Sequence, residues 1–144
     1  MNIHLETAGL LCLPEPGLAV VEFRRVLIDS GLGAIRPVDD LERLQCMLSA
    51  ADVVMTARRG DASRELLGVA RCITDFSWCA YLSDLAVSPS AQGLGVGRAL
   101  LEALRRQLGP QVTLALQSVP AAAGFYERAG MARMADAFCH RRAH

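Results

Sequence analysis

A glycine-rich segment lies between a long strand pattern and an amphipathic helix pattern, and it constrains the fold more than any other feature. The strand pattern covers Trp78–Val87, and the helix pattern runs from about Gly95 to Leu108. One stripe of this helix is apolar and expected to be buried: Leu100, Leu101, Leu104 and Leu108. This order places backbone N–H groups and a helix N-terminus at the end of a strand, which suits an anion such as pyrophosphate. Glycines also form ordinary tight turns, so the loop alone leaves both interpretations open.

Two other nucleotide-binding patterns do not fit this loop. A Rossmann fingerprint requires a third glycine where the chain has Arg98, counted from Gly93, or Leu100, counted from Gly95. A P-loop requires a lysine, and all 15 basic residues are arginine. The same bias excludes a lysine Schiff base.

The composition predicts one globular domain spanning residues 1–144. Hydrophobic residues make up 52% of the 144 and charged residues 21%. Basic and acidic residues number 15 each, so the net charge of 0 does not favour a nucleic-acid partner. The apolar stretches are shorter than the roughly 20 residues of a membrane span, and the first residues do not form a signal-peptide pattern. We therefore expect a cytoplasmic protein with neither a membrane nor a nucleic-acid partner.

The cysteines and histidines do not predict a metal site. None of the five cysteines forms a C-x-x-C pair, so we expect reduced, mostly buried thiols. His140 and His144 lie near Cys139 in the C-terminal segment, which is poorly suited to enclose a metal ion.

The remaining patterns predict a mixed α/β domain with the order β-α-α-β-β-β-α-β-α-β. The expected strands are Asn2–Thr7, Val53–Arg58, Glu65–Thr74, Trp78–Val87, Val112–Gln117 and Met131–Arg141. Four helices are expected, and three of them are Leu18–Ser30, Gly95–Leu108 and Ala121–Ala129. The remaining helix follows a cap at Asp39 or Asp40 and has Leu41, Leu44, Met47 and Leu48 on one face. Within Gly95–Leu108, Glu102 is expected to pair with Arg106. The last strand could pair across two subunits and so form a homodimer.

Three motifs in order carry a family resemblance. Gln92-Gly93-Leu94-Gly95-Val96-Gly97 fits the pattern Q/R-x-x-G-x-G/A, the strand Tyr81–Val87 with Ser88-Pro89 precedes it, and Phe125–Met131 follows as F-Y-E-x-x-G-M. At these positions the sequence resembles the GCN5-related N-acetyltransferase superfamily, closely from about Leu66 onward. The resemblance implies an α/β (α+β) fold, with a mixed, mostly antiparallel, twisted sheet whose splayed central strands are flanked by helices.

The resemblance also implies acetyl-CoA as co-substrate, without a metal. The pantetheine arm would pair with the backbone of Leu85, Ala86 and Val87, as an added strand does. The pyrophosphate would contact the N–H groups of Gln92, Gly93, Leu94, Gly95, Val96, Gly97 and Arg98. The Arg98 guanidinium could add charge there, or it could be a solvated helix residue.

The family's usual proton donor is a tyrosine, and Tyr126 occupies the matching position. Its phenol could protonate the leaving thiolate, or the ring could only pack a helix on the sheet. Asp84 and Asp75 are candidate bases, acting directly or through water, and each could instead bind a cationic substrate or cap a turn. The N–H of the strand near Leu85 could hold the thioester carbonyl oxygen.

The acetyl acceptor is expected near Ile35–Arg36 and near Phe76, Trp78 and Cys79. The aromatic rings there could stack on an apolar amine or belong to the core, and Cys79 is expected to be a buried structural thiol. The sequence thus predicts acetyl transfer to a primary amine of a small molecule. A protein or peptide N-acetyltransferase and a non-catalytic acyl-CoA sensor are the alternatives.

Overall fold

The structure is a computed structural model that describes residues 5–7, 9–91 and 93–144. Its strands are β1 (Leu5–Thr7), β2 (Leu10–Pro14), β3 (Val53–Arg59), β4 (Leu66–Thr74), β5 (Cys79–Val87) and β6 (Thr113–Leu116). Its α-helices are α1 (Val20–Asp29), α2 (Leu41–Ala50), α3 (Val96–Leu108) and α4 (Ala123–Arg128), with short 3₁₀ helices at Leu32–Ile35, Pro89–Ala91 and Pro120–Ala122.

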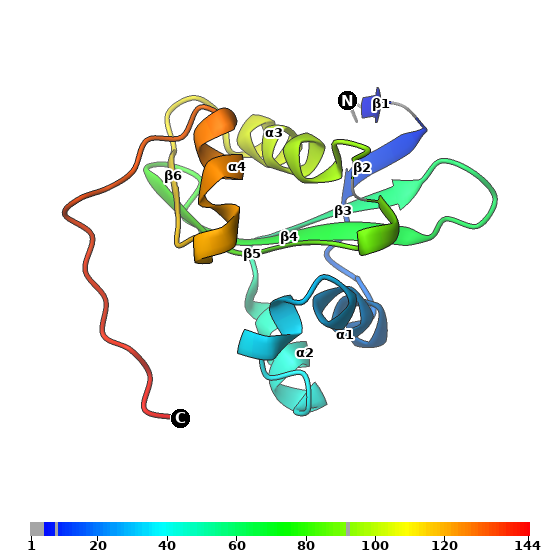
Figure 1. Cartoon of the computed structure of the whole chain (residues 1–144), viewed down its shortest axis with the longest axis horizontal. Helices are drawn as coiled ribbons and strands as arrows, with labels where there is room; N and C mark the ends of the chain where they lie inside the picture. The colour runs from blue at the N-terminus through cyan, green and yellow to red at the C-terminus, as the bar shows by residue number, and fades with distance from the viewer. Residues whose placement is uncertain (1–4, 8, 92) are drawn as a thin grey trace.

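One sheet contains all six strands in chain order. Neighbours from β1 to β5 are antiparallel, and β6 is parallel to β5. Figure 1 shows α1 and α2 on one face of this sheet, with α3 and α4 on the other. The expected mixed, mostly antiparallel sheet flanked by helices is therefore confirmed.

Each face of the sheet has its own apolar core. Phe23, Leu44 and Val69 belong to the core beneath α1 and α2. Leu67 and Leu100 belong to the core beneath α3. Because β4 lies between both cores, its residues from Leu66 to Cys72 are buried on either side, as expected of a strand covered by helices.

Local chemistry explains the boundaries of the helices that position the site. The carboxylate of Asp40 accepts a hydrogen bond from the N–H of Arg43 at 2.9 Å and starts α2. Gly109, with φ +86°, follows the last turn of α3. A Cβ at Gly68 of β4 would lie 2.9 Å from Val96 and 3.0 Å from Leu100. This glycine therefore lets the first turns of α3 approach the sheet closely.

The predicted element order is wrong at both ends. The strand expected at Asn2–Thr7 is described only as β1, since residues 2–4 lie outside the described residues. The expected order also lacked β2. Pro14 is the last residue of this strand, where a missing N–H is tolerated.

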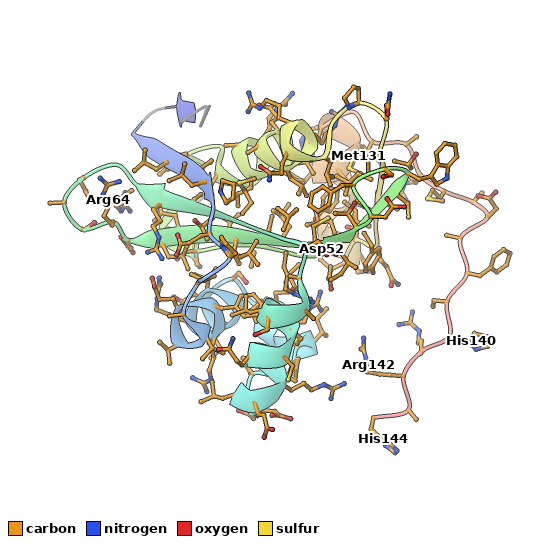
Figure 2. The ribbon with its side chains drawn as sticks, turned by 180° about the vertical axis from the view of Figure 1, so that it is seen from behind. Asp52, Arg64, Met131, His140, Arg142 and His144 are labelled. Atoms are coloured by element: carbon orange, nitrogen blue, oxygen red, sulfur yellow. The ribbon has the colours of Figure 1, made fainter. Side chains whose placement is uncertain are left out.

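The strand expected at Met131–Arg141 is wrong. The structure assigns no strand to residues 131–144, and residues 132–144 are exposed along their whole length. Figure 2 shows this segment, with His140, Arg142 and His144 labelled, running apart from the rest of the molecule. We call residues 132–144 the C-terminal arm.

Three smaller expectations also differ from the structure. Leu41 lies on α2 but is exposed, while Leu44 and Leu48 are buried as expected. Glu102 pairs with Arg98 at 3.2 Å rather than with Arg106. The thiols are not mostly buried, since the exposed ones are Cys46, Cys79 and Cys139 and the buried ones are Cys12 and Cys72.

Candidate active site

The two central strands separate partway along their length. β6 pairs with β5 from Cys79 to Leu82, and it ends at Leu116, opposite Leu82. β5 continues to Val87 while its other edge stays paired with β4. The backbone from Ser83 to Val87 therefore extends beyond β6, and among the described residues no strand pairs with this edge, as an added strand-like ligand would.

A β-bulge lies where the strands separate. Arg71 is opposite Asp84 and Cys72 is opposite Leu82, so Ser83 is an extra residue in β5. The extra residue reverses the alternation of the strand. Ala80 and Leu82 face the α3 core before the bulge, and Leu85 packs on that same core after it.

The glycine loop connects β5 to α3 through a short 3₁₀ turn. Gly93 and Gly95 have φ of +84° and +73°, a left-handed conformation that L side chains rarely adopt. A Cβ at either position would have no protein atom within 4 Å. Among the described residues, no side chain caps the first turn of α3. The N–H groups of this turn are therefore available to an anion. Gln92 lies outside the described residues.

Gly97 joins the three sequence motifs. A Cβ at this position would lie 3.3 Å from the Phe125 ring and 3.7 Å from the side chain of Val87. The structure thus brings the end of β5, the start of α3 and helix α4 into contact. Gly97 serves close packing of α4 on α3, whereas Gly93 and Gly95 shape the loop.

Tyr126 is half-buried on the face of the sheet where the strands separate. Its ring meets that of Phe125 edge to face, with centroids 5.0 Å apart. It packs on the same core as Leu85, Val87 and Leu116. Burial raises the pKa of the Tyr126 phenol above its ordinary value of about 10. The phenol therefore keeps its proton throughout the neutral range.

Asp84 lies on the opposite face of the sheet, where two arginines enclose it. Its carboxylate accepts bonds at 2.5 Å from the Nε atoms of Arg36 and Arg71. Arg36 also donates to the carbonyl oxygen of Ser83, and Arg71 donates to the Ser83 hydroxyl and the carbonyl oxygen of Met47. Asp84 is 1% exposed. The network ties the bulge to the segments before and within α2, and the sheet separates it from Tyr126.

The role of Arg71 was not predicted from the sequence. The available signal is its position as a single charged residue within the apolar strand Leu66–Thr74. A charge inside such a strand requires a buried partner, and Asp84 is the strand residue opposite it. Nothing in the sequence indicates the bulge at Ser83.

Asp75 has the structural role that was one of the two alternatives. Its Oδ1 accepts hydrogen bonds from the N–H groups of Ser77 and Trp78 at 2.9 and 2.8 Å, and from Cys79 at 3.2 Å. These bonds, that from Trp78 above all, lower the pKa of the Asp75 carboxyl. Asp75 therefore shapes the turn between β4 and β5.

The residues expected at the acceptor end are exposed. Phe76 is about half exposed and Trp78 is 76% exposed, so neither is a core residue. Cys79 is exposed too, and the expectation of a buried thiol there is wrong. The aromatic rings thus remain available for contact with a ligand or partner.

Within the described residues, no three His, Cys, Asp or Glu side chains form a group suited to a metal ion. No helix there is both long and apolar enough to span a bilayer.

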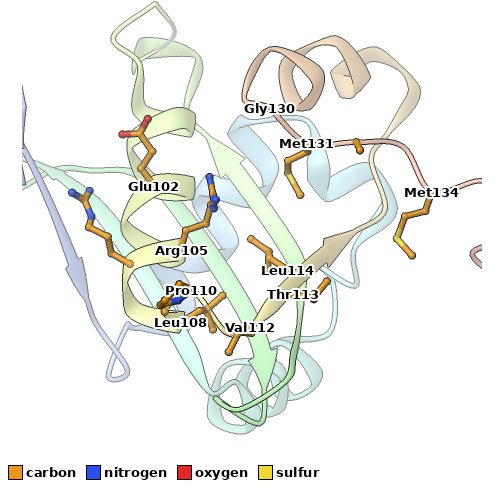
Figure 3. A pocket seen from close by; sticks show the side chains of 13 residues that line it. Glu102, Arg105, Leu108, Pro110, Val112, Thr113, Leu114, Gly130, Met131 and Met134 are labelled. Carbon is orange, nitrogen blue, oxygen red and sulfur yellow. The ribbon is translucent and has the colours of Figure 1, made fainter.

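A groove of about 790 Å³ lies between the end of α3 and β6, at the opposite end of α3 from the glycine loop (Figure 3). The residues of α3 that line it begin at Glu102, about 10 Å along the helix from that loop.

Comparison with known families agrees with this geometry. Residues 51–130 match the model of the acetyltransferase (GNAT) domain, which is more than half of the chain. The matched region contains the bulged strand, the glycine loop, α3 and α4. The chain belongs to the GNAT acetyltransferase family.

Similar proteins have names consistent with this family. A serotonin N-acetyltransferase 2 (chloroplastic) from Oryza sativa subsp. japonica is 37% identical over 99 residues, which are 67% of this chain and 50% of that protein. An N-acetyltransferase from Porphyra purpurea, ycf52, is described as uncharacterized and is 27% identical over 67% of this chain and 57% of its own length. A histone acetyltransferase from Glycine max is 41% identical over 34% of this chain and 21% of its own length. The chain spans about half the length of the first two relatives.

Solved structures share the fold. A GNAT family acetyltransferase from Streptococcus pneumoniae has a TM-score of 0.68 at 21% identity, covering 92% of this chain and 99% of that one. An aminoglycoside acetyltransferase from an uncultured soil metagenomic sample, solved with sisomicin, has a TM-score of 0.67 at 17% identity, covering 94% and 97%. At these identities the likeness is one of fold.

Proposed function

We propose that this chain is an N-acetyltransferase that moves an acetyl group from acetyl-CoA to a primary amine of a small molecule. The proposal rests mainly on the separation of β5 from β6 next to the N-terminus of α3, which follows the glycine loop and has no side-chain cap. This arrangement offers a strand edge for an extended amide-containing arm and N–H groups for a pyrophosphate, side by side. Acetyl-CoA carries both groups in one molecule.

The cofactor-binding residues follow from that geometry. The backbone of Leu85, Ala86 and Val87 would pair with the pantetheine arm. The pyrophosphate would contact the loop and first helical turn: Gln92, Gly93, Leu94, Gly95, Val96, Gly97 and Arg98. Arg98 is exposed and already pairs with Glu102 at 3.2 Å, so any charge it lends to a phosphate competes with that pair.

Tyr126 is the proposed general acid for the departing thiolate. A phenol above pKa 10 is a weaker acid than a thiol of about 8.5, which opposes transfer by at least roughly 2 kcal/mol. The thiolate would form in the same apolar surroundings, where burial raises the pKa of a thiol as well. Because the pKa of the thiol rises in the same direction as that of the phenol, burial of both groups keeps proton transfer within reach.

Asp84 fits a positioning role better than that of a general base. Both of its oxygens accept bonds from arginine side chains, and the sheet separates it from Tyr126. We propose that the Arg36–Asp84–Arg71 network holds the bulge at Ser83, and with it the N–H groups that face the thioester. The amine would then lose its proton to water.

The acceptor is proposed to be an amine with an apolar or aromatic group. Phe76 and Trp78 are exposed in the turn just before the start of β5, where they could stack on such a group. The relative named as a serotonin N-acetyltransferase supports this class. The relative named as a histone acetyltransferase supports a peptide acceptor as the second candidate. A reducing compartment such as the cytoplasm suits the five free thiols.

The test is release of free CoA thiol from acetyl-CoA across a panel of amines. The panel contains serotonin, an aminoglycoside such as sisomicin, and peptides with free N-termini or lysines. Turnover with an arylalkylamine supports the small-molecule proposal, and turnover with peptides alone supports the second candidate. Tight acetyl-CoA binding without turnover on any amine would make the chain a sensor and refute the enzyme proposal.

A further inference from the structure

The network of Arg36, Asp84 and Arg71 contains one more positive charge than negative. Two guanidinium groups share the single carboxylate of Asp84, and within the described residues neither arginine has a second salt-bridge partner. Backbone carbonyl oxygens also accept bonds from both arginines, but they supply only partial negative charge. One arginine is enough to balance Asp84. The other leaves an unbalanced charge in a mostly buried network, which is costly unless an anion balances it.

Arg36 is the member of this network that a ligand can reach. Its side chain is 20% exposed, whereas those of Arg71 and Asp84 are 9% and 0% exposed. A guanidinium has five N–H groups. Arg36 donates three of them, to Asp84 and to the carbonyl oxygens of Ile35 and Ser83. The part of the chain that the structure describes therefore offers no acceptor to the other two, and a carboxylate is a well-matched ligand for such donors.

Arg36 also lies beside the backbone where the thioester is proposed to react. Its Nη2 donates to the carbonyl oxygen of Ser83 at 2.7 Å, and Ser83 is the extra residue of the bulge. In an α-amino acid, the amine nitrogen and the carboxylate carbon are roughly 2.5 Å apart. A carboxylate bound at Arg36 therefore places the α-amine beside the bulge. The neighbouring Ile35 is 58% exposed, so it offers contact to an apolar side chain of the same ligand.

We propose that the acetyl acceptor is an α-amino acid with an apolar or aromatic side chain, and that Arg36 binds its carboxylate. This inference rests on the proposed acetyltransferase function, and it narrows the acceptor from primary amines to amines with a carboxylate on the same carbon. The bound carboxylate balances the second guanidinium. A cationic group, one of the ligands considered for Asp84, is disfavoured there because the network is already positive.

The reaction at this site is an ordinary acetyl transfer. The α-amine nitrogen forms the new amide bond to the acetyl carbon as the C–S bond of the thioester breaks. The amine loses its proton to water, and the departing thiolate takes a proton from Tyr126, as proposed above. Arg36 binds and orients the acceptor and exchanges no proton.

The test first measures binding by calorimetry in protein saturated with CoA, where no turnover occurs. Two sets of compounds are compared: L-tryptophan, L-tryptophanamide and tryptamine, and L-leucine, L-leucinamide and isopentylamine. Within each set the amide replaces the carboxylate with a neutral group of similar size, and the amine lacks it. Hydrogen bonds between a carboxylate and a guanidinium contribute at least about tenfold to an affinity. In at least one set, we expect the acid to bind at least about tenfold more tightly than its amide and its amine.

Arg36→Met is expected to remove this preference, so that acid and amide bind within about twofold of each other. Asp84 keeps Arg71 as its partner, so the variant is expected to fold. Arg24→Met is the matched control. Arg24 also donates from Nε to a carbonyl oxygen in the segment between α1 and α2, that of Val38 at 2.7 Å, but it has no bond to Asp84. This variant is expected to keep the preference for the acid.

Release of CoA thiol from acetyl-CoA by the same six compounds separates this inference from the proposed function. Amides and amines that react as fast as the acids would support an N-acetyltransferase and overturn the carboxylate site. Tighter binding of an acid without turnover of any compound would refute the proposed function and support the carboxylate site. Acids that bind no more tightly than their amides, or the same preference in Arg36→Met, would overturn the inference.

Discussion

Replacing Tyr126 with phenylalanine separates catalysis from packing. The ring and its edge-to-face contact with Phe125 remain, and only the hydroxyl is lost. The ring is only half-buried and keeps its packing, so the free energy of unfolding should change by less than about 0.5 kcal/mol. If the phenol protonates the thiolate, the substitution raises the barrier of the chemical step instead.

The expected magnitude follows from the role of a general acid. Such groups contribute about 10²–10⁴-fold to a rate, and water can replace part of that contribution. We expect Tyr126→Phe to slow acetyl transfer at least roughly tenfold, about 1.4 kcal/mol in barrier height, with little change in acetyl-CoA affinity.

The assay is single-turnover acetyl transfer with enzyme in excess, which isolates chemistry from product release. Tyr81→Phe is the matched control, because it removes the other phenol of the chain from an exposed position on β5. Its rate should equal that of the wild type. Equal single-turnover rates for the wild type and Tyr126→Phe would remove Tyr126 from the mechanism.

Three further predictions concern the loop, the buried network and acid stability. Gly95→Glu should weaken acetyl-CoA binding at least tenfold, as measured by calorimetry. The control Gly31→Glu changes a glycine that is also left-handed (φ +87°), so it should cost a comparable ~1–2 kcal/mol of stability but leave the affinity for acetyl-CoA intact. Equal affinities of the two variants would contradict the loop assignment. Asp84→Asn should lower the free energy of unfolding in urea by about 3 kcal/mol or more, because buried arginines lose their counter-charge, and a loss under 1 kcal/mol would contradict this. A hydrogen bond from Arg58 lowers the pKa of the Glu15 carboxyl in the folded protein. The contribution of Glu15 to stability is therefore complete above its unfolded pKa of about 4.3 and is lost as the pH falls through the lower folded pKa. Below about pH 5, melting temperatures measured across pH should fall more steeply for the wild type than for Glu15→Gln.

The sequence by itself determined the elements that depend on local chemistry. The leucine stripe of α3, the glycines at its start and the cap at Asp40 act within one or two helical turns, so their spacing can be read directly. The same holds for the candidate cofactor loop, whereas the turn that Asp75 shapes was one of several roles that the sequence left open for this residue. These features were enough to indicate the family, because its motifs lie within single strand–loop–helix units.

Only the tertiary structure decided which distant residues meet. Asp84 is enclosed by Arg36, which is 48 residues away, and by Arg71 on the paired strand, so its role depends on pairing register and on the bulge at Ser83. The C-terminal arm shows the same limit. Its sequence favoured a strand, but a strand forms only where it pairs with another, and within the described chain this segment pairs with none. The arm's conformation therefore depends on long-range contacts, which local sequence patterns do not specify.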